Sequence, residues 1–385
     1  MSYSLCPECD QKMINYWCQP CNSKHFQNDF NNWTSGNDKI DKFIQDSQLN
    51  AIMDWEVIEW IPYNQFKKDV KQIDKGGFGT IHYSKWVRSI KELDIENQQW
   101  KRDEQKEVVL KKFDNFVNFN NVLNEMVIHL KIWIELASIQ FYGITQDPET
   151  HSYMMVLQYA EDENLREYLK KNFNNINWLQ KLKSLYILSV RLLRIYELGI
   201  VHQDFHPGNI LSSDFKKTIW ISDFGLNKLI EINPNNPKKN NIFGVLPYIA
   251  PEVLSGGEKY TKASDVYSYG IIAYEIVTGF PPYPDISHDQ DLTMKICNRP
   301  PFEELRDELR KYTNWYSAYL DKGKYKDLEI VIQIKKADEF SANQESTNMT
   351  ATTTITTTTP LNYQTHLQEI YTSQIHSWVL EHLNN

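Results

Sequence analysis

The stretch His-Gln-Asp-Phe-His-Pro-Gly-Asn at residues 202–209 places an aspartate, Asp204, a few positions before an asparagine, Asn209, and Asp-Phe-Gly follows at 223–225. Carboxylate and amide oxygens are the groups with which proteins hold Mg²⁺ and accept protons. Short motifs of this kind also occur in ordinary loop turns. Their meaning therefore depends on what lies on either side of them in the chain.

Upstream, the cluster Lys75-Gly76-Gly77-Phe78-Gly79 lies between strands predicted over 69–73 and 80–86. Glycines let a backbone approach phosphate oxygens and point its amide groups at the charge. Taken alone, the cluster is better explained as a tight hairpin. A third predicted strand, 107–112, carries Lys111, and the polar stretch 88–106 before it is predicted to be a loop.

Helical periodicity predicts a helix over 119–134, with Glu125 at the edge of its apolar stripe, where it can pair with Lys111. Further helices are predicted from about Asn177 to a stop at Gly199, and over 264–278, where the sequence is apolar on almost every side. Ala-Pro-Glu at 250–252 and Asp265 to Gly270 complete the series of motifs. Strands first and helices later predict a small α+β lobe joined to a larger helical lobe.

In this order the motifs resemble the eukaryotic protein kinase family, most closely its tyrosine-kinase-like group and the expanded kinase family of arbuscular mycorrhizal fungi. The resemblance implies an α+β, bilobal kinase domain over 66–325 that transfers the γ-phosphate of ATP to a protein substrate. It implies that Lys111 holds the phosphates and is fixed by Glu125, that Asp204 accepts the proton of the attacking hydroxyl, and that Asn209 and Asp223 hold Mg²⁺.

For ATP, the resemblance makes Leu157 the gatekeeper and turns the Gln158 carbonyl and the Ala160 amide toward the adenine. The residues it implies around ATP are Ile73, Gly76, Gly77, Phe78, Gly79, Ile81, Val109, Lys111, Leu157, Gln158, Ala160, Asn209, Leu211 and Asp223.

Several positions depart from the kinase pattern. Asp74 replaces the first glycine of the phosphate loop, and its negative charge is expected to weaken ATP binding. Gln203 replaces the arginine before Asp204, and residues 226–247 contain no Ser, Thr or Tyr, so loop phosphorylation is not expected to switch the protein on. His206 and Val245 replace a usual lysine and threonine, which leaves a Ser/Thr class expected but open against Tyr.

The C-terminal lobe is predicted to be short. Arg299, the candidate partner of Glu252, follows it too closely, as if one helix were absent between Asn298 and Arg299. An uncovered helix over 264–278 would expose apolar surface, which predicts low thermal stability or self-association through this lobe. A charged and Thr-rich tail with a short C-terminal helix is expected over 326–385.

At the other end, Cys6-x-x-Cys9 and Cys18-x-x-Cys21 form two closely spaced pairs. Four thiolates at such spacing are typical of a closed, structural zinc site, which predicts a zinc module over 1–33. Four unrelated free thiols are the alternative interpretation. A linker that is helical over 39–49 is expected for 34–65, and Cys297 is expected to be a buried apolar side chain.

Composition narrows the partners and the location. A net charge of −9 and a pI near 5.6 argue against nucleic acid as a partner. No apolar run reaches the roughly 18 residues of a membrane span, and the N-terminus lacks a secretory pattern. An intracellular, cytoplasmic location is expected, with the nucleus left open. Two readings compete with an active kinase: a pseudokinase or scaffold that binds nucleotide or partners, and a zinc-dependent interaction protein with a vestigial kinase region.

Overall fold

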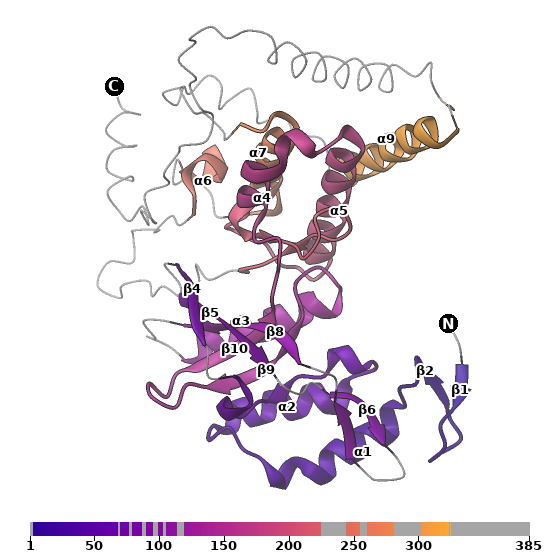
Figure 1. The fold of residues 1–385 in the computed structure, drawn as a ribbon, viewed down its shortest axis with the longest axis vertical. Helices are drawn as coiled ribbons and strands as arrows, with labels where there is room; N and C mark the ends of the chain where they lie inside the picture. Colours follow the sequence, from indigo (N-terminus) through magenta and orange to yellow (C-terminus); the bar gives the residue numbers. More distant parts are fainter. Residues whose placement is uncertain are drawn as a thin grey trace, which may run out of the picture. The chain divides into compact units, whose positions relative to one another are not determined.

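The computed structural model describes residues 3–67, 70–76, 79–86, 90–94, 99–102, 105–113, 119–224, 244–254, 260–280, 302–322 and 324. The chain splits into two compact units. We call Met1–Tyr159 with Phe224–Glu231 the sheet unit, and Ala160–Asp223 with Ile232–Asn385 the helical unit. Figure 1 shows the helices and strands of both, and each unit is described by itself.

The sheet unit is built on a six-stranded sheet in the order β3-β9-β10-β8-β5-β4. All neighbouring strands are antiparallel except β3, which runs parallel to β9. Alternate residues of β8, Val108 and Leu110, are buried on one face together with Trp86 and Val156. The strands are β3 (Glu59–Trp60), β4 (Lys71–Gly76), β5 (Gly79–Trp86), β8 (Lys106–Lys112), β9 (Phe141–Gln146) and β10 (Tyr153–Gln158).

The strands predicted over 80–86 and 107–112 are confirmed as β5 and β8, and the one predicted over 69–73 appears as β4, shifted toward Gly76. The prediction of a loop over 88–106 is wrong. Strands β6 (Ile90–Asp94) and β7 (Gln99–Arg102) pair there as a separate antiparallel hairpin. The stretch is rich in charged residues, which is why composition favoured a loop, but a two-stranded ladder is held by backbone groups that composition does not reveal.

Helix α3 (Phe119–Ile134) is confirmed, and its buried side chains include Val122, Met126 and Ile132. Near its C-terminal end, the Trp133 indole N–H donates to the Trp55 carbonyl oxygen, 2.8 Å away. Residue 55 belongs to the short 3₁₀ turn η2 (Asp54–Glu56). The helix is therefore bound to a segment that precedes the sheet in the sequence.

That segment, 34–65, was expected to be a partly helical linker, and in the structure it packs into the sheet unit. The predicted helix is present as α2 (Asp38–Asn50), capped by the Asn37 side chain, and its Ile40 and Ile44 are fully buried. Strand β3 then joins the sheet, and a second 3₁₀ turn, η3 (Tyr63–Gln65), leads on toward β4.

The close approach of β3 to β9 depends on Gly143. Its φ is +154°, and a Cβ at this position would lie 2.0 Å from the Glu59 carbonyl oxygen. No side chain fits between two backbones at that distance. Gly143 is thus the position that lets residues before the sheet become part of it.

The cysteine-bearing segment packs against the C-terminal end of α2. It consists of β1 (Tyr3–Leu5), β2 (Lys12–Ile14), α1 (Gln19–Asp29) and η1 (Phe30–Asn32). Trp17, Phe26, Ala51 and Val57 form one buried apolar cluster, and the Trp17 indole N–H donates to the Ala51 carbonyl oxygen at 3.0 Å. The segment is thereby fixed to α2.

The helical unit contains α4 (Leu165–Asn172), η4 (Phe173–Asn175), α5 (Trp178–Glu197), η5 (Pro207–Asn209), β11 (Ile210–Leu211), β12 (Trp220–Ile221), η7 (Leu246–Tyr248), α6 (Pro251–Leu254), α7 (Lys262–Thr278) and α9 (Phe302–Lys322). A capping box of Asn177 and Gln180 starts α5, and Gly199, with φ +74°, follows its end as predicted. The helices α5 and α7 are joined by a hydrogen bond from the Tyr269 hydroxyl to the Leu185 carbonyl oxygen.

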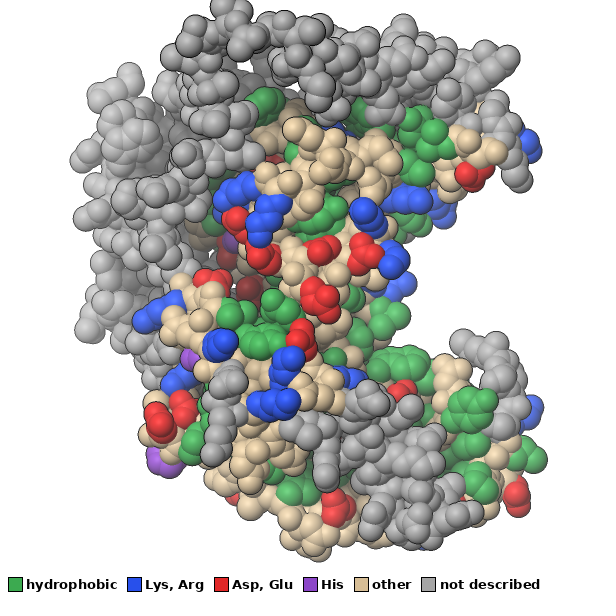
Figure 2. All heavy atoms as spheres, in the orientation of Figure 1, with side chains coloured by type: hydrophobic (Ala, Val, Ile, Leu, Met, Phe, Trp, Pro, Cys, Tyr) green, Lys and Arg blue, Asp and Glu red, His purple; other side chains and the backbone are tan. Residues whose placement is uncertain are grey.

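Most of α7 is buried, in keeping with its apolar sequence, and α9 packs on α5. The predicted absence of a helix between Asn298 and Arg299 concerns residues outside the described part of the chain. The predicted tail over 326–385 also lies outside it, so both stay predictions. In the described parts of the chain, no helix is both long and apolar enough to cross a membrane. Figure 2 shows basic and acidic side chains interspersed over the described surface that faces the viewer.

Candidate functional site

In the sheet unit, Lys111 and Glu125 form a buried ion pair. Lys111 Nζ lies 2.9 Å from Glu125 Oε1, and the two side chains are only 7% and 4% exposed. The alternation of β8 turns the next residue, Lys112, to the other face, where its Nζ pairs with Asp147 at 2.9 Å. The adjacent residues Lys111 and Lys112 thus pair with different acids. The pair predicted from the sequence, Lys111 with Glu125, is the more deeply buried one.

The register of the sheet gathers other predicted residues on the Lys111 face. Ile81 of β5 is directly opposite Lys111, and Leu157 of β10 is directly opposite Val109. Cross-strand partners and residues two apart share a face, so Ile81, Val109, Lys111 and Leu157 line one surface. This surface can hold a flat apolar group beside an ammonium.

The remaining predicted residues of this unit lie at the ends of strands. Gln158 closes β10, and its N–H donates to the Gln140 carbonyl oxygen at 2.9 Å. Ile73 on β4 is 51% exposed. Gly77 and Phe78 fall outside the described residues, and Gly76 and Gly79 bound the gap between β4 and β5.

Gly79 has a structural reason of its own. A Cβ there would lie 2.2 Å from the Lys112 carbonyl oxygen, so the close pairing of β5 with β8 already demands glycine. Asp74 is exposed and its carboxylate accepts the Lys75 backbone N–H at 2.7 Å. The Lys75 backbone N–H therefore already compensates part of the negative charge of the Asp74 carboxylate.

Phe224 of the Asp-Phe-Gly motif belongs to the sheet unit. It is 1% exposed, and its ring packs edge-on against the ring of His129 on α3, with centroids 6.0 Å apart. The helix that carries Glu125 therefore also contacts the residue after Asp223.

In the helical unit, Asp204 and Asn209 are brought together as predicted. Asn209 Nδ2 donates to the Asp204 backbone oxygen at 2.9 Å and to its Oδ2 at 3.4 Å. The Asn209 carbonyl oxygen accepts the Ser222 N–H at 2.9 Å, which places Asp223, with φ +62°, directly beside this loop. Leu211 lies on β11 and is half-buried; Ala160 opens the unit and is also half-buried.

Asp265, which in the sequence is only the first residue of the motif at 265–270, holds the loop that carries Asp204 in place. Its carboxylate accepts the backbone N–H groups of His202 at 2.7 Å and Gln203 at 3.0 Å. Gln203 has φ +72°, a strained conformation for a side-chain-bearing residue. An acid in the first turn of an otherwise apolar helix was the available sequence signal.

His202 anchors the other side of the loop. It is fully buried, its Nε2 donates to the Ser222 carbonyl oxygen at 2.9 Å, and burial lowers its pKa to about 4. A neutral His202 thus ties the Asp204 loop to the strand that leads into Asp223.

Asp204 itself lies beside His206 with its side chain 17% exposed and its Oδ1 atom buried. His206 Nε2 lies 3.5 Å from Asp204 Oδ1, and His206 Nδ1 accepts the Gly208 N–H at 3.0 Å. Burial acts to raise the pKa of Asp204, but His206, His202 and Asn209 outweigh it, and the net shift is downward. A carboxylate kept ionised in this way is suited to accept a proton at neutral pH.

A second buried polar group adjoins the loop. The Tyr248 hydroxyl makes a short hydrogen bond to Glu275 Oε1 and accepts one from Arg166 Nη2 at 3.4 Å. Burial raises the pKa of Glu275 to about 7, although Tyr248 and Arg166 act in the opposite direction. Glu275 was not predicted from the sequence, where it is the only acid in the largely apolar stretch 269–280.

The side chains of the candidate site are of the types that bind Mg²⁺ and phosphate, the groups that the kinase resemblance implies. Because Asn209 Nδ2 is used in binding Asp204, the Asn209 amide oxygen can act as an acceptor, and the backbone of Ser222, the residue before Asp223, is hydrogen-bonded to Asn209. Oxygen donors of this type suit Mg²⁺. Lys111, held by Glu125, offers a fixed ammonium for phosphate oxygens.

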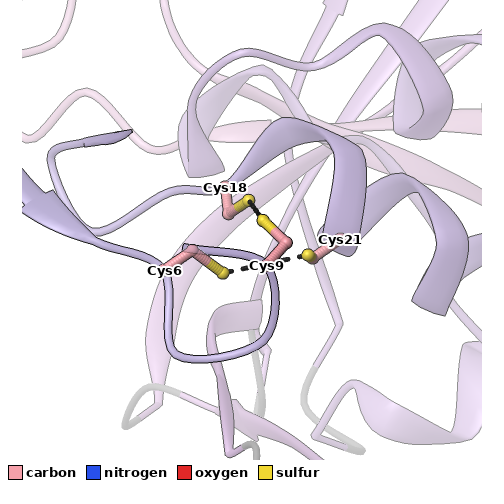
Figure 3. A group of neighbouring side chains, drawn as sticks. All are labelled: Cys6, Cys9, Cys18 and Cys21. Atoms are coloured by element: carbon pink, nitrogen blue, oxygen red, sulfur yellow. Dashed lines mark hydrogen bonds between the residues drawn. The ribbon is translucent and has the colours of Figure 1, made fainter. Parts of the chain in front are cut away.

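The four N-terminal cysteines converge, as Figure 3 shows. Cys6 and Cys21 have their sulfur atoms 3.8 Å apart, those of Cys9 and Cys18 are 3.6 Å apart, and all four sulfurs lie within 4.8 Å of one another. These separations are far longer than the roughly 2.05 Å of a disulfide bond. The thiols therefore form a four-sulfur cluster without a covalent bridge.

The pKa values of Cys9, Cys18 and Cys21 are not all shifted in the same direction. Burial, aided by neighbouring thiols, raises the pKa of Cys21, and burial raises the pKa of Cys18 to about 11. A hydrogen bond from the Gln11 backbone N–H lowers the pKa of Cys9. Four sulfurs this close together are stable as thiolates only with a cation among them.

Comparisons with known proteins agree with this geometry. Residues 68–311 match the family model described as protein tyrosine and serine/threonine kinase. The chain is 27% identical over 219 residues to tyrosine-protein kinase SPK-1 of Girardia tigrina, covering 56% of the chain and 40% of that protein. It is 26% identical over 265 residues to a serine/threonine-protein kinase of Arabidopsis thaliana, covering 65% of the chain and 47% of that protein.

A third relative is the mitogen-activated protein kinase kinase kinase nsy-1 of Caenorhabditis elegans, which is 23% identical over 230 residues. That match covers 58% of the chain and 14% of the relative. The chain thus spans less than half the length of each of these curated relatives.

Proposed function

The chain belongs to the protein tyrosine and serine/threonine kinase family, and from this premise we propose that it is an active, ATP-dependent protein kinase that phosphorylates Ser or Thr. The proposal covers activity, hydroxyl class and the roles of individual residues. Its main support is the arrangement around Asp204, a carboxylate flanked by His206 and Asn209 in a loop that Asp265 holds.

The chemistry asks the protein mainly for alignment and for neutralisation of charge. ATP with Mg²⁺ supplies the phosphoryl group. Lys111 binds phosphate oxygens, and its ion pair with Glu125 fixes the position of the ammonium. Asn209 and Asp223 would contribute oxygen ligands for Mg²⁺. Asp204 would accept the proton of the substrate hydroxyl as the hydroxyl oxygen attacks the γ-phosphorus of ATP and ADP leaves.

The Ser/Thr class has two supports. Residues 244–248, Gly-Val-Leu-Pro-Tyr, look more like a Ser/Thr platform for substrate than a tyrosine one. The Arabidopsis relative is also named a serine/threonine-protein kinase, although the planarian one is named a tyrosine-protein kinase. Phosphoamino-acid analysis of a phosphorylated generic substrate would separate the classes.

The test of the proposed activity is magnesium-dependent transfer of phosphate from ATP to a generic protein substrate by the full chain. Asp204→Asn should lower kcat by roughly 10²-fold or more, as expected for loss of a general base, while ATP binding is retained. Asp214→Asn, which alters an aspartate in a surface turn of the same unit, is the matched control and should behave as wild type. ATP binding without transfer by wild type would favour the scaffold interpretation.

We also propose that the cysteine cluster binds one structural zinc ion. Sulfurs at the corners of a zinc tetrahedron with bonds of about 2.3 Å are separated by about 3.8 Å. The separations of 3.8 Å between Cys6 and Cys21 and of 3.6 Å between Cys9 and Cys18 agree with that value. The zinc would stabilise the segment 1–33, and the cytoplasm stays the predicted location for a protein with these reduced thiols.

A further inference from the structure

Asp204 Oδ1 is buried and has no hydrogen-bond partner among the described residues. His206 Nε2, at 3.5 Å, faces this oxygen. We propose that His206 is the positioning residue of Asp204: it directs an N–H at Oδ1 and holds the carboxylate in the orientation that receives the proton of the substrate. The inference rests on the proposed function, because it assigns His206 a part in the same phosphotransfer.

The tautomer of His206 follows from its other nitrogen. Nδ1 accepts the Gly208 backbone N–H at 3.0 Å. A ring nitrogen that accepts a hydrogen bond carries no proton, so the proton of the neutral ring resides on Nε2. The neutral ring of His206 therefore presents a donor to Asp204 while Nδ1 accepts the Gly208 N–H.

The backbone keeps the ring in this place. Through Nδ1, His206 caps the 3₁₀ turn η5, a task usually performed by Asn, Asp or Ser. A Cβ at Gly208 would lie 2.8 Å from His206 Cε1 and 2.9 Å from Nδ1. Glycine at 208 therefore provides the space in which the ring lies, and the ring cannot turn without losing its cap.

Asp204 needs such a partner because the terminal torsion of an aspartate is broad and poorly defined by itself. Asn209 Nδ2 contacts Oδ2 at 3.4 Å, and His206 faces Oδ1, so the carboxylate is held from two sides. On a third side lies Gly244, where a Cβ would lie 3.4 Å from Oδ1, so a side chain at this position would crowd the carboxylate.

Two substitutions separate capping from positioning. In His206→Asn the amide oxygen can still accept the Gly208 N–H, but the short side chain has no group that reaches Asp204. In His206→Lys the ammonium restores a donor to Asp204, but the cap is lost. The first variant tests the Nε2 donor, and the second tests whether a donor alone is sufficient.

For the full chain we expect His206→Asn to keep the thermal midpoint and the KM for ATP. Its kcat should fall roughly tenfold to a hundredfold, the effect of a misplaced catalytic group. His206→Lys should have a lower thermal midpoint and a higher kcat than His206→Asn. Histidine ¹⁵N NMR of the neutral wild-type protein should show Nδ1 as the unprotonated nitrogen of His206.

The outcomes separate this inference from the proposed function. An inactive wild type, in an assay where a control kinase works, would overturn the proposed function and this role with it. If wild type is active and His206→Asn has the same kcat, only the role of His206 is overturned. The same holds if His206→Lys is no better than His206→Asn, or if NMR finds the proton on Nδ1.

Discussion

Lys111 of β8 and Glu125 of α3 meet in a buried ion pair with 2.9 Å between Nζ and Oε1. The pair joins the centre of the sheet to α3, the longest helix described in the sheet unit. Because both groups are removed from water, removal of either leaves the other charge uncompensated.

Lys111→Met should reduce phosphotransfer by roughly 10²-fold or more, since a fixed charge at the phosphates is lost. Loss of one partner of a buried pair should also lower the free energy of unfolding by about 3–5 kcal/mol. Lys112→Met is the matched control, because this neighbour pairs with Asp147 on the other face of β8. Steady-state kinetics and chemical denaturation measure both effects, and equal loss of activity in the two variants would contradict the assignment of Lys111.

Glu275 predicts how stability depends on pH. Burial raises its pKa from 4.5 to about 7, so the folded protein retains a proton that the unfolded chain releases between those values. The stabilisation is complete below about pH 4.5 and is lost as pH rises to about 7.

Glu275→Gln, a neutral mimic of the protonated side chain, should therefore flatten the fall of the thermal midpoint between about pH 5 and 7. Asp265, whose pKa burial also raises to about 7, should sustain the slope that remains. Identical pH profiles for wild type and Glu275→Gln would show that Glu275 is ionised in the folded protein.

Gly143→Ala tests the attachment of β3. The new methyl group would meet the Glu59 carbonyl oxygen at 2.0 Å, so β3 must leave β9 or the backbone must shift. We expect a loss of at least about 1–3 kcal/mol in the free energy of unfolding, as for other enforced backbone strain. Gly270→Ala in α7, where a Cβ meets nothing within 4 Å, should be neutral or stabilising.

Amide hydrogen exchange of residues 141–146 would locate the effect of Gly143→Ala, because strand pairing protects the amides of β9. Protection equal to that of wild type would mean that β3 remains paired, which would refute the argument from the glycine.

Metal analysis of the purified full chain should find about one zinc per molecule, bound by Cys6, Cys9, Cys18 and Cys21. Cys6→Ser should abolish it and make residues 1–33 more sensitive to limited proteolysis, with ATP binding retained. Cys297→Ser, the remaining cysteine, should keep the metal. A metal-free wild type after growth in zinc-replete medium would refute the zinc site.

Helices and strands were predicted most accurately from the sequence where the hydrophobic periodicity matches the observed burial. The helix over 119–134 and the strand over 107–112 bury helically spaced or alternating apolar side chains, and the structure contains both. The strand over 80–86 is present as well, although its buried side chains include Thr80 and Ser84 beside Trp86. The hairpin of β6 and β7 could not be predicted in this way. Its strands carry few apolar side chains, and backbone pairing leaves no residue signature of its own.

In the candidate site, the motifs predicted which residues come together within a unit, such as Asp204 with Asn209 and Lys111 with Glu125. They did not predict the residues that hold those groups. Asp265 acts through backbone N–H groups, and any residue type can provide those. Nε2 of His206 lies nearest Asp204, and whether it carries the proton of the neutral ring depends on the hydrogen bond of Nδ1 to a glycine amide, which no side-chain pattern records.

The parallel pairing of β3 with β9 changes where this kinase can be cut. A truncated protein that starts at residue 66, the boundary that the motifs suggest, would lack β3 and leave one side of β9 as an unpaired sheet edge. Such edges recruit strands from other molecules. Preparations of the isolated catalytic domain should therefore aggregate more than the full chain, and a soluble fragment should begin before α2, at Trp33 or earlier.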